Sequence, residues 1–287
     1  MIGRRPLLLG FGAALATPHR LGASAPTQGA VDLVLNGAWR QGGYALGRTE
    51  SRALIFVDGE ALSTASADGL FIVGFDRDAP AQVEIEARSG ARSTRRVLEV
   101  APYAFPSTRV DGLPPATVEP TDPALLDRIR QEVALKTEAF ASRADADDFG
   151  DGFIWPLETY RISSEWGAQR ILNGTPARPH YGIDLAAPAG TVIRAPADGR
   201  IIFTRPNMHF EGGLTLIDHG QGLISAYLHQ SQLDVTQDQP VRRGDPLGRV
   251  GMTGRATGPH LCWRLKWRDR NLDPSLLVGA RAPQRLA

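Results

Sequence analysis

The sequence has one cysteine and almost no net charge. A single cysteine excludes an internal disulfide, so Cys262 has to be a free thiol, a buried filler or a ligand. Lys and Arg number 32 against 31 Asp and Glu, which leaves a formal charge of only +1. No large positive field would steer the protein to nucleic acid, and we expect no nucleic-acid partner.

A long apolar run is also missing. Residues 7–16 are apolar but fall well short of the about 20 residues that a membrane helix needs. They follow Arg4-Arg5 and precede the small-x-small site at residues 23–25, which is the pattern of a secretory signal. We therefore expect residues 1–25 to be a Sec or twin-arginine signal peptide. The mature protein would then reach the periplasm or cell-wall space without a transmembrane segment.

At 287 residues the chain has room for two domains, and the first predicted unit is β-rich. Residues 53–57 form an apolar run that ends at Asp58-Gly59, a strong hairpin signal. Residues 82–87 alternate apolar and polar side chains before another turn. Short strands with regular turns predict a small β-sandwich over residues 26–110.

A Pro-rich linker and a helix are predicted over residues 111–150. Asp122 can cap a helix that has Pro123 at its first position. We interpret this helix as a brace across one domain, and covering the cleft is a further hypothesis. The apolar residues that recur at helical spacing are Leu126, Ile129, Val133 and Phe140.

Residues 151–287 are predicted to form a second domain that is nearly all β. Gly-containing turns separate most of its strand-like segments, and no good helical pattern occurs. The chemistry-bearing residues lie here. Pro179 and Pro188 argue for an extended chain around His180 and Asp184, in which these two side chains share a face. An imidazole and a carboxylate on one face suit Zn²⁺.

Two further segments supply candidate residues. His229 closes a strand-like segment, and a loop with three glycines and a proline leads into His260-Leu261-Cys262. His260 and Cys262 are two residues apart on an extended strand, so they face the same side.

Residues 153–267 resemble the catalytic domain of lysostaphin/LytM-type zinc endopeptidases, which cleave peptidoglycan peptides. The resemblance implies a mainly β protein with a LytM-type (duplicated hybrid motif) antiparallel domain after the sandwich and connecting helix. Many pieces match in order. They are Trp155-Pro156, Ile162-Ser163-Ser164, Trp166-Gly167, residues 180–188, Gly190-Thr191-Val192, Ala197-Asp198-Gly199, Asp218-His219-Gly220, Tyr227-Leu228-His229, residues 241–248 and residues 253–262.

Site residues follow from the resemblance by position. It implies that one zinc ion is held by His180, Asp184 and Cys262, with an open position for water whose pKa the metal lowers to near 7. His229 and His260 match the family's two non-ligand histidines, which handle the water proton and the developing oxyanion. The implied reaction is hydrolysis of peptide bonds in stem or cross-link peptides, without a covalent intermediate.

Cys262 departs from the family pattern, which has histidine there. As a thiolate it is a sound zinc ligand, and every other site position is intact, so we favour this interpretation. Alternatively, the domain is degenerate and binds the wall or activates another hydrolase, which would be its partner. In the third interpretation, Cys262 is a small buried residue.

The remaining candidates are weaker. Tyr227 and His209 are predicted substrate contacts, whereas His219 in a hairpin turn is expected to be structural. Trp263 and Trp267 alternate with arginines, and we interpret them as core or cleft wall rather than a nucleic-acid surface. A phosphocarrier-like domain is an alternative interpretation of this half of the chain. The predicted export signal and Asp184 argue against it.

Overall fold

The structure is a computed structural model that describes residues 29–112 and 120–284. The predicted signal peptide and most of the Pro-rich segment lie outside these residues. Within them the chain is mainly β, which confirms the predicted fold class. None of the described helices is both long and apolar enough to cross a membrane.

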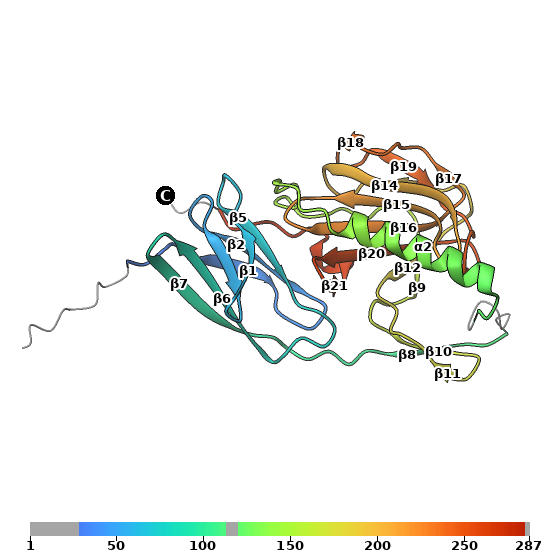
Figure 1. Ribbon diagram of the computed structural model, residues 1–287, viewed down its shortest axis with the longest axis horizontal. Coiled ribbons are helices and arrows are strands. Elements are labelled where there is room, and N and C mark those ends of the chain that lie inside the picture. The colour runs from blue at the N-terminus through green and yellow to red at the C-terminus, as the bar shows by residue number, and fades with distance from the viewer. Residues whose placement is uncertain (1–28, 113–119, 285–287) are drawn as a thin grey trace, which may run out of the picture.

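Two antiparallel sheets make up the N-terminal part (Figure 1). One has the strand order β1–β2–β5 and the other β4–β3–β6–β7. Leu46 and Ile72 of the first sheet share a buried core with Ile55 and Ile85 of the second, so the predicted β-sandwich is confirmed. The strands are β1 Val34–Ala38, β2 Tyr44–Arg48, β3 Leu54–Val57, β4 Glu60–Thr64, β5 Leu70–Gly74, β6 Gln82–Ser89 and β7 Arg92–Glu99.

The C-terminal part is built on an eight-stranded sheet. Its order is β18–β14–β15–β16–β20–β12–β9, and β21 also pairs with β20. A smaller sheet, β13–β19–β17, completes this half. The elements are β9 Arg161–Ser164, β12 Ile183–Ala186, β13 Val192–Arg194, β14 Gly199–Met208, β15 Gly212–Asp218, β16 Leu223–Gln230, β17 Gln232–Leu233, β18 Pro240–Val241, β19 Pro246–Arg249, β20 His260–Trp267, β21 Arg270–Leu272 and the 3-10 helix η1 Pro274–Leu277.

Strand β20 separates the core from the site. Trp263 and Trp267 are fully buried in the main core, as expected from the alternation of side chains. Cys262 belongs to a second cluster on the opposite face of the sheet, together with Leu216 and Leu228. One face of β20 therefore packs in the main core, and the other face carries Cys262.

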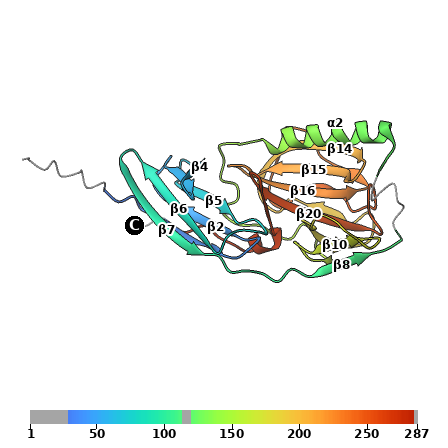
Figure 2. The same ribbon diagram turned by 60° about the horizontal axis from the view of Figure 1, so that its bottom comes forward.

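Helix α2 (Pro123–Phe140) lies across this second face, over β14, β15 and β16 (Figures 1 and 2). The Asp122 carboxylate accepts hydrogen bonds from the backbone N–H groups of Ala124 and Leu125, so the predicted cap is confirmed. Part of the predicted apolar stripe is wrong, because Val133 is 48% exposed. Glu132 and Lys136 are the partly buried residues of this middle turn instead.

The segment that leaves the sandwich contributes a strand beside the site. Strand β8 (Ser107–Val110) pairs in parallel with β10 (Gln169–Leu172), which forms a hairpin with β11 (Thr175–Pro176). The predicted sandwich segment ran to residue 110, yet its last four residues join this other sheet.

The sandwich and the large sheet share one buried core. A Cβ atom on Gly74 of β5 would lie 2.7 Å from Leu272 and 3.2 Å from Trp267, so the two parts are in close contact there. The Tyr44 hydroxyl donates to the carbonyl of Leu276 at 3.1 Å, and the Gln221 amide donates to the carbonyl of Leu70 at 3.0 Å.

Candidate metal centre and active site

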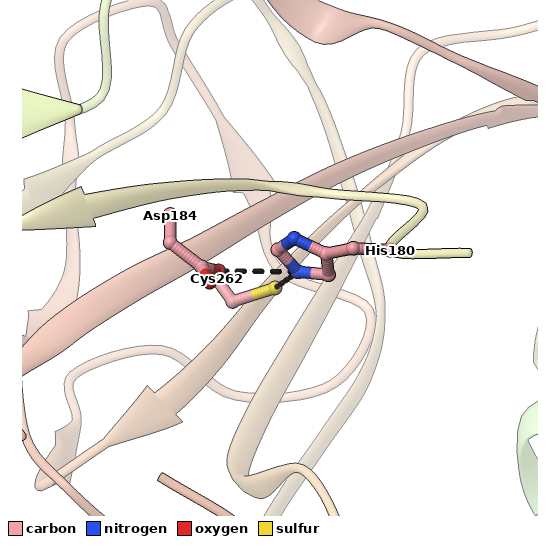
Figure 3. Close-up of side chains that lie close together, drawn as sticks. All are labelled: His180, Asp184 and Cys262. Atoms are coloured by element: carbon pink, nitrogen blue, oxygen red, sulfur yellow. Dashed lines mark hydrogen bonds and ion pairs between the residues drawn. The ribbon is translucent and has the colours of Figure 1, made fainter. Parts of the chain in front are cut away.

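His180, Asp184 and Cys262 come together on one face of the large sheet (Figure 3). Asp184 on β12 and Cys262 on β20 are paired across neighbouring strands, and His180 precedes β12. Nε2 of His180 lies 3.2 Å from Oδ1 of Asp184 and 3.3 Å from Sγ of Cys262. All three residues are buried, with the three ligand atoms within 4.8 Å of one another.

Gly182 makes this close approach sterically feasible. A Cβ atom there would lie 2.8 Å from Sγ of Cys262 and 2.9 Å from Cγ of Arg264. Real Cβ atoms essentially never come that close to a neighbour. The glycine between His180 and Asp184 therefore leaves the space that the thiol occupies.

Nδ1 of His180 and Oδ2 of Asp184, which point away from the centre of the group, each have a hydrogen-bond partner outside it. Nδ1 of His180 lies 3.1 Å from Oγ of Ser164, and Arg170 donates to Oδ2 of Asp184 at 3.0 Å. Oδ1 of Asp184 is buried and makes no hydrogen bond. A buried carboxylate oxygen without a hydrogen bond is costly unless a cation faces it. The nitrogen, oxygen and sulfur donors therefore fit a metal ion, and this donor set suits zinc.

The charges of these residues shift one another's pKa values. Burial acts to lower the pKa of His180, but the charges of Cys262 and Asp184 outweigh it and the pKa is raised. For Asp184, burial acts to raise the pKa, yet His180, His260 and Arg170 lower it well below the usual value. Asp184 is thus held as a carboxylate, the form that binds a metal.

His229 and His260 lie beside the three donors. Their ring centroids are 4.7 Å apart, and Nε2 of His260 is 3.7 Å from Oδ1 of Asp184. Nδ1 of His229 faces the carbonyl of Thr253, and Nδ1 of His260 faces that of Gly258, each at 2.8 Å. A carbonyl only accepts, so each Nδ1 carries a hydrogen and each neutral ring has its lone pair on Nε2.

Burial keeps both of these imidazoles neutral. It lowers the pKa of His229 and that of His260 below the ordinary value of 6.5. A buried neutral histidine with a free Nε2 can accept a proton near neutral pH.

A β-bulge turns His229 toward the site. Strict alternation would put His229 on the same face as Tyr227, which is in the main core. The pairing of β15 with β16 shifts register after Gly213, and His229 has a left-handed φ of 65°. Bulges re-aim side chains in this way, and strained non-glycine residues cluster at functional sites.

Three arginines also border the site, and the sequence interpretation did not single them out. Arg170 holds Asp184, while Nε of Arg264 donates to Sγ of Cys262 at 3.5 Å. Arg255 stacks on the ring of Phe210 at 4.7 Å. Burial lowers the pKa of Arg255, and the charges of Arg170 and Arg264 lower it further. The sequence offered one signal for these arginines. Arg264 follows Cys262 by two residues, and on an extended strand this spacing puts both side chains on the same face.

The other predicted residues do not belong to the donor group. Tyr227 is fully buried in the main core and its hydroxyl lies 2.8 Å from Oγ of Ser225, which argues against contact with a substrate. His219 is also fully buried, with Nδ1 facing the carbonyl of Asp198 and Nε2 facing Ser225, as a structural histidine would be. His209 is half-buried, and its backbone N–H donates to Glu132 of α2.

Comparison with known proteins agrees with this geometry. Residues 178–274 match the model of Peptidase family M23. A crystal structure from Pseudomonas aeruginosa that is assigned to peptidase M23 is 30% identical, with a TM-score of 0.65, and the alignment covers 84% of this chain and 96% of that one. The chain belongs to peptidase family M23. The M23 match contains all five residues: His180, Asp184, His229, His260 and Cys262.

Two curated relatives have the names of peptidases. Peptidoglycan DD-endopeptidase ShyA of Vibrio cholerae is 39% identical over 121 residues, which is 42% of this chain and 28% of that protein. DD-carboxypeptidase/endopeptidase Mpg of Neisseria meningitidis is 40% identical over 121 residues, with the same two shares. The chain therefore spans less than a third of the length of these relatives.

Proposed function

We propose that this protein is a zinc-dependent endopeptidase that hydrolyses peptide bonds in the stem or cross-link peptides of peptidoglycan. The observation that carries the proposal is the buried Oδ1 of Asp184, which makes no hydrogen bond and faces His180 and Cys262. Membership of family M23 and the names of the relatives support it.

The proposed roles follow from the atoms that face the centre. Nε2 of His180, Oδ1 of Asp184 and Sγ of Cys262 would hold the metal. When bound, zinc polarises a carbonyl group and lowers the pKa of a water molecule. Nε2 of His229 or His260 can accept a proton from the attacking water and pass it to the leaving amine. His180 is kept in orientation by Ser164, and Asp184 by Arg170.

The charge around the site supports a wall-peptide substrate. Arg170, Arg255 and Arg264 lie near one another in a protein whose total charge is only +1. Stem peptides of peptidoglycan carry free carboxylates, and guanidinium groups bind carboxylates well. This function also requires export, so we propose that residues 1–25 act as a signal peptide and that the protein works in the periplasm or cell-wall space.

We also propose a division of the chain into domains. Residues 151–287 would carry the peptidase site, residues 26–110 the sandwich, and residues 111–150 the linker with α2. A further hydrolase or a regulator of wall hydrolysis is the proposed class of protein partner.

The test measures zinc content and muropeptide cleavage for the wild type, Cys262→Ser and Cys262→His. We expect one zinc ion per wild-type chain, and a fall of tenfold or more in zinc affinity and activity for the serine variant. The histidine variant should keep both. If the serine variant retains full zinc and activity, Cys262 is not a ligand. Wild-type protein without zinc and without cleavage would support the non-catalytic alternative.

A further inference from the structure

Helix α2 is held by polar contacts more than by apolar burial. None of its residues is fully buried, and only its C-terminal residues Ala139 and Phe140 pack against the second apolar cluster. Helices of globular proteins usually gain their stability from a buried apolar face. The inward positions in the middle of α2 are instead taken by Glu132 and Lys136.

These polar residues bind the turn between β14 and β15, which we call the 207–212 hairpin. The carboxylate of Glu132 accepts a hydrogen bond from the backbone N–H of His209 at 2.8 Å. Arg128 donates to the carbonyl of Asn207. Lys136 pairs with the carboxylate of Glu211, and the two side chains are only 16% and 11% exposed. Such a poorly hydrated pair is screened less than one on the surface.

The 207–212 hairpin in turn holds His229. The carbonyl of Glu211 accepts the backbone N–H of His229 at 2.8 Å. Thr253, whose carbonyl accepts Nδ1–H of His229, is fixed by a hydrogen bond from the N–H of Gly213 to its hydroxyl at 2.9 Å. Both restraints on His229 therefore pass through the hairpin or the residue that follows it.

His229 needs restraint because of its backbone. A residue with a Cβ atom adopts a left-handed φ only when the surrounding structure holds it there. The three proposed metal donors lie elsewhere, on β12, on β20 and just before β12. A loosened hairpin would thus disturb His229 before it disturbed the donors.

We infer that the ion pair between Lys136 and Glu211 positions the imidazole of His229, so that α2 acts as a brace for proton transfer. The inference rests on the proposed peptidase function for its kinetic consequence. Lys136 and Glu211 are positioning residues that act through the hairpin backbone. The brace comes from the linker, outside residues 178–274 that match the M23 model.

The experiment compares Lys136→Met and Glu211→Gln with the charge-reversed double variant Lys136→Glu/Glu211→Lys. We expect kcat on a muropeptide to fall about 10-fold or more in each single variant, with KM and zinc content within twofold of wild type. The double variant should recover most of kcat. Arg130→Met is the matched control, because Arg130 is exposed on α2 and, within the described part of the chain, its ion pair is with Asp127 of the same helix. Its kcat should not change.

A second readout does not depend on catalysis. Histidine ¹⁵N NMR spectra of the metal-free protein should show His229 as one Nδ1–H tautomer in the wild type and as a tautomer mixture in Lys136→Met. Wild-type kcat and an unchanged tautomer in both single variants would overturn the brace. Loss of zinc in step with kcat would also overturn it, since the pair would then support the metal centre. A wild type that cleaves nothing would refute the proposed function, while the NMR result would still decide the brace.

Discussion

Nε2 of His180 lies 3.3 Å from Sγ of Cys262, although 82 residues separate them in the chain. The thiol occupies the room that Gly182 leaves by having no side chain. Arg264 also contacts the sulfur, with Nε at 3.5 Å. The cysteine lies at the edge of the second apolar cluster, but its sulfur contacts an imidazole and a guanidinium group, which is not the setting of an inert apolar filler.

Gly182→Ala should weaken zinc binding. The added methyl group would meet Sγ of Cys262 at 2.8 Å and Nε2 of His180 at 3.3 Å, so at least one donor must shift. We expect zinc affinity, measured by competition with a chelator, to fall about 10- to 100-fold. Gly258→Ala is the control, because its Cβ would meet no atom within 4 Å. Equal affinities of the two variants would contradict the steric role of Gly182.

The pH dependence of hydrolysis should show an acid limb below pH 6.5. Burial lowers the pKa values of His229 and His260 from 6.5, so each ring gains its proton with a midpoint below pH 6.5. Because the proposed base must be neutral, kcat/KM should fall on acidification with a midpoint below pH 6.5. An acid limb centred above pH 7 would exclude both histidines as the base.

Arg255→Gln should reduce the preference for substrates with a free carboxylate. Losing one charge-assisted hydrogen bond costs about 1.5–3 kcal/mol, which is roughly 10- to 100-fold in kcat/KM. The comparison uses one muropeptide with its carboxylates free and the same peptide with them amidated. We expect the loss with the free acid and a much smaller change with the amide. A uniform loss with both peptides would assign Arg255 a purely structural role.

His219 should make the fold sensitive to acid. Burial lowers its pKa from 6.5 to about 4, so the unfolded chain binds a proton at a higher pH than the native one. The stability is therefore complete above pH 6.5 and decreases as pH falls toward 4, by up to about 3 kcal/mol. Urea unfolding at pH 7.5 and pH 4.5 measures this slope. The slope should be shallower in His219→Gln, and an unchanged slope would show that other groups cause it.

Local sequence patterns predicted much of the fold. The Asp58-Gly59 turn between β3 and β4 has both residues at positive φ, as a tight hairpin requires. Alternation along an extended chain predicted that His180 and Asp184 share a face, and the structure places both in the donor group, with Nε2 of His180 3.2 Å from Oδ1 of Asp184. Their close contact was not predicted, because His180 precedes β12 and is not part of the strand.

Long-range partners account for what the sequence did not reveal. Lys136 is turned inward by Glu211, 75 residues away, and no local apolar pattern encodes that pairing. Arg170 reaches Asp184 from a hairpin that pairs with β8, and the parallel pairing links segments that are far apart in the chain. The side of the sheet on which His229 lies depends on a β-bulge. Simple alternation would assign His229 to the opposite side.

The contact of Gly74 with Leu272 and Trp267 bears on how the two parts of the chain can evolve. Replacing the sandwich by recombination would expose the buried Trp267 and Leu272 to water. A different N-terminal domain would also need a position without a side chain opposite these two residues. We therefore expect the sandwich to be inherited together with its peptidase half, so that natural chimaeras joined between residues 74 and 267 should be rare.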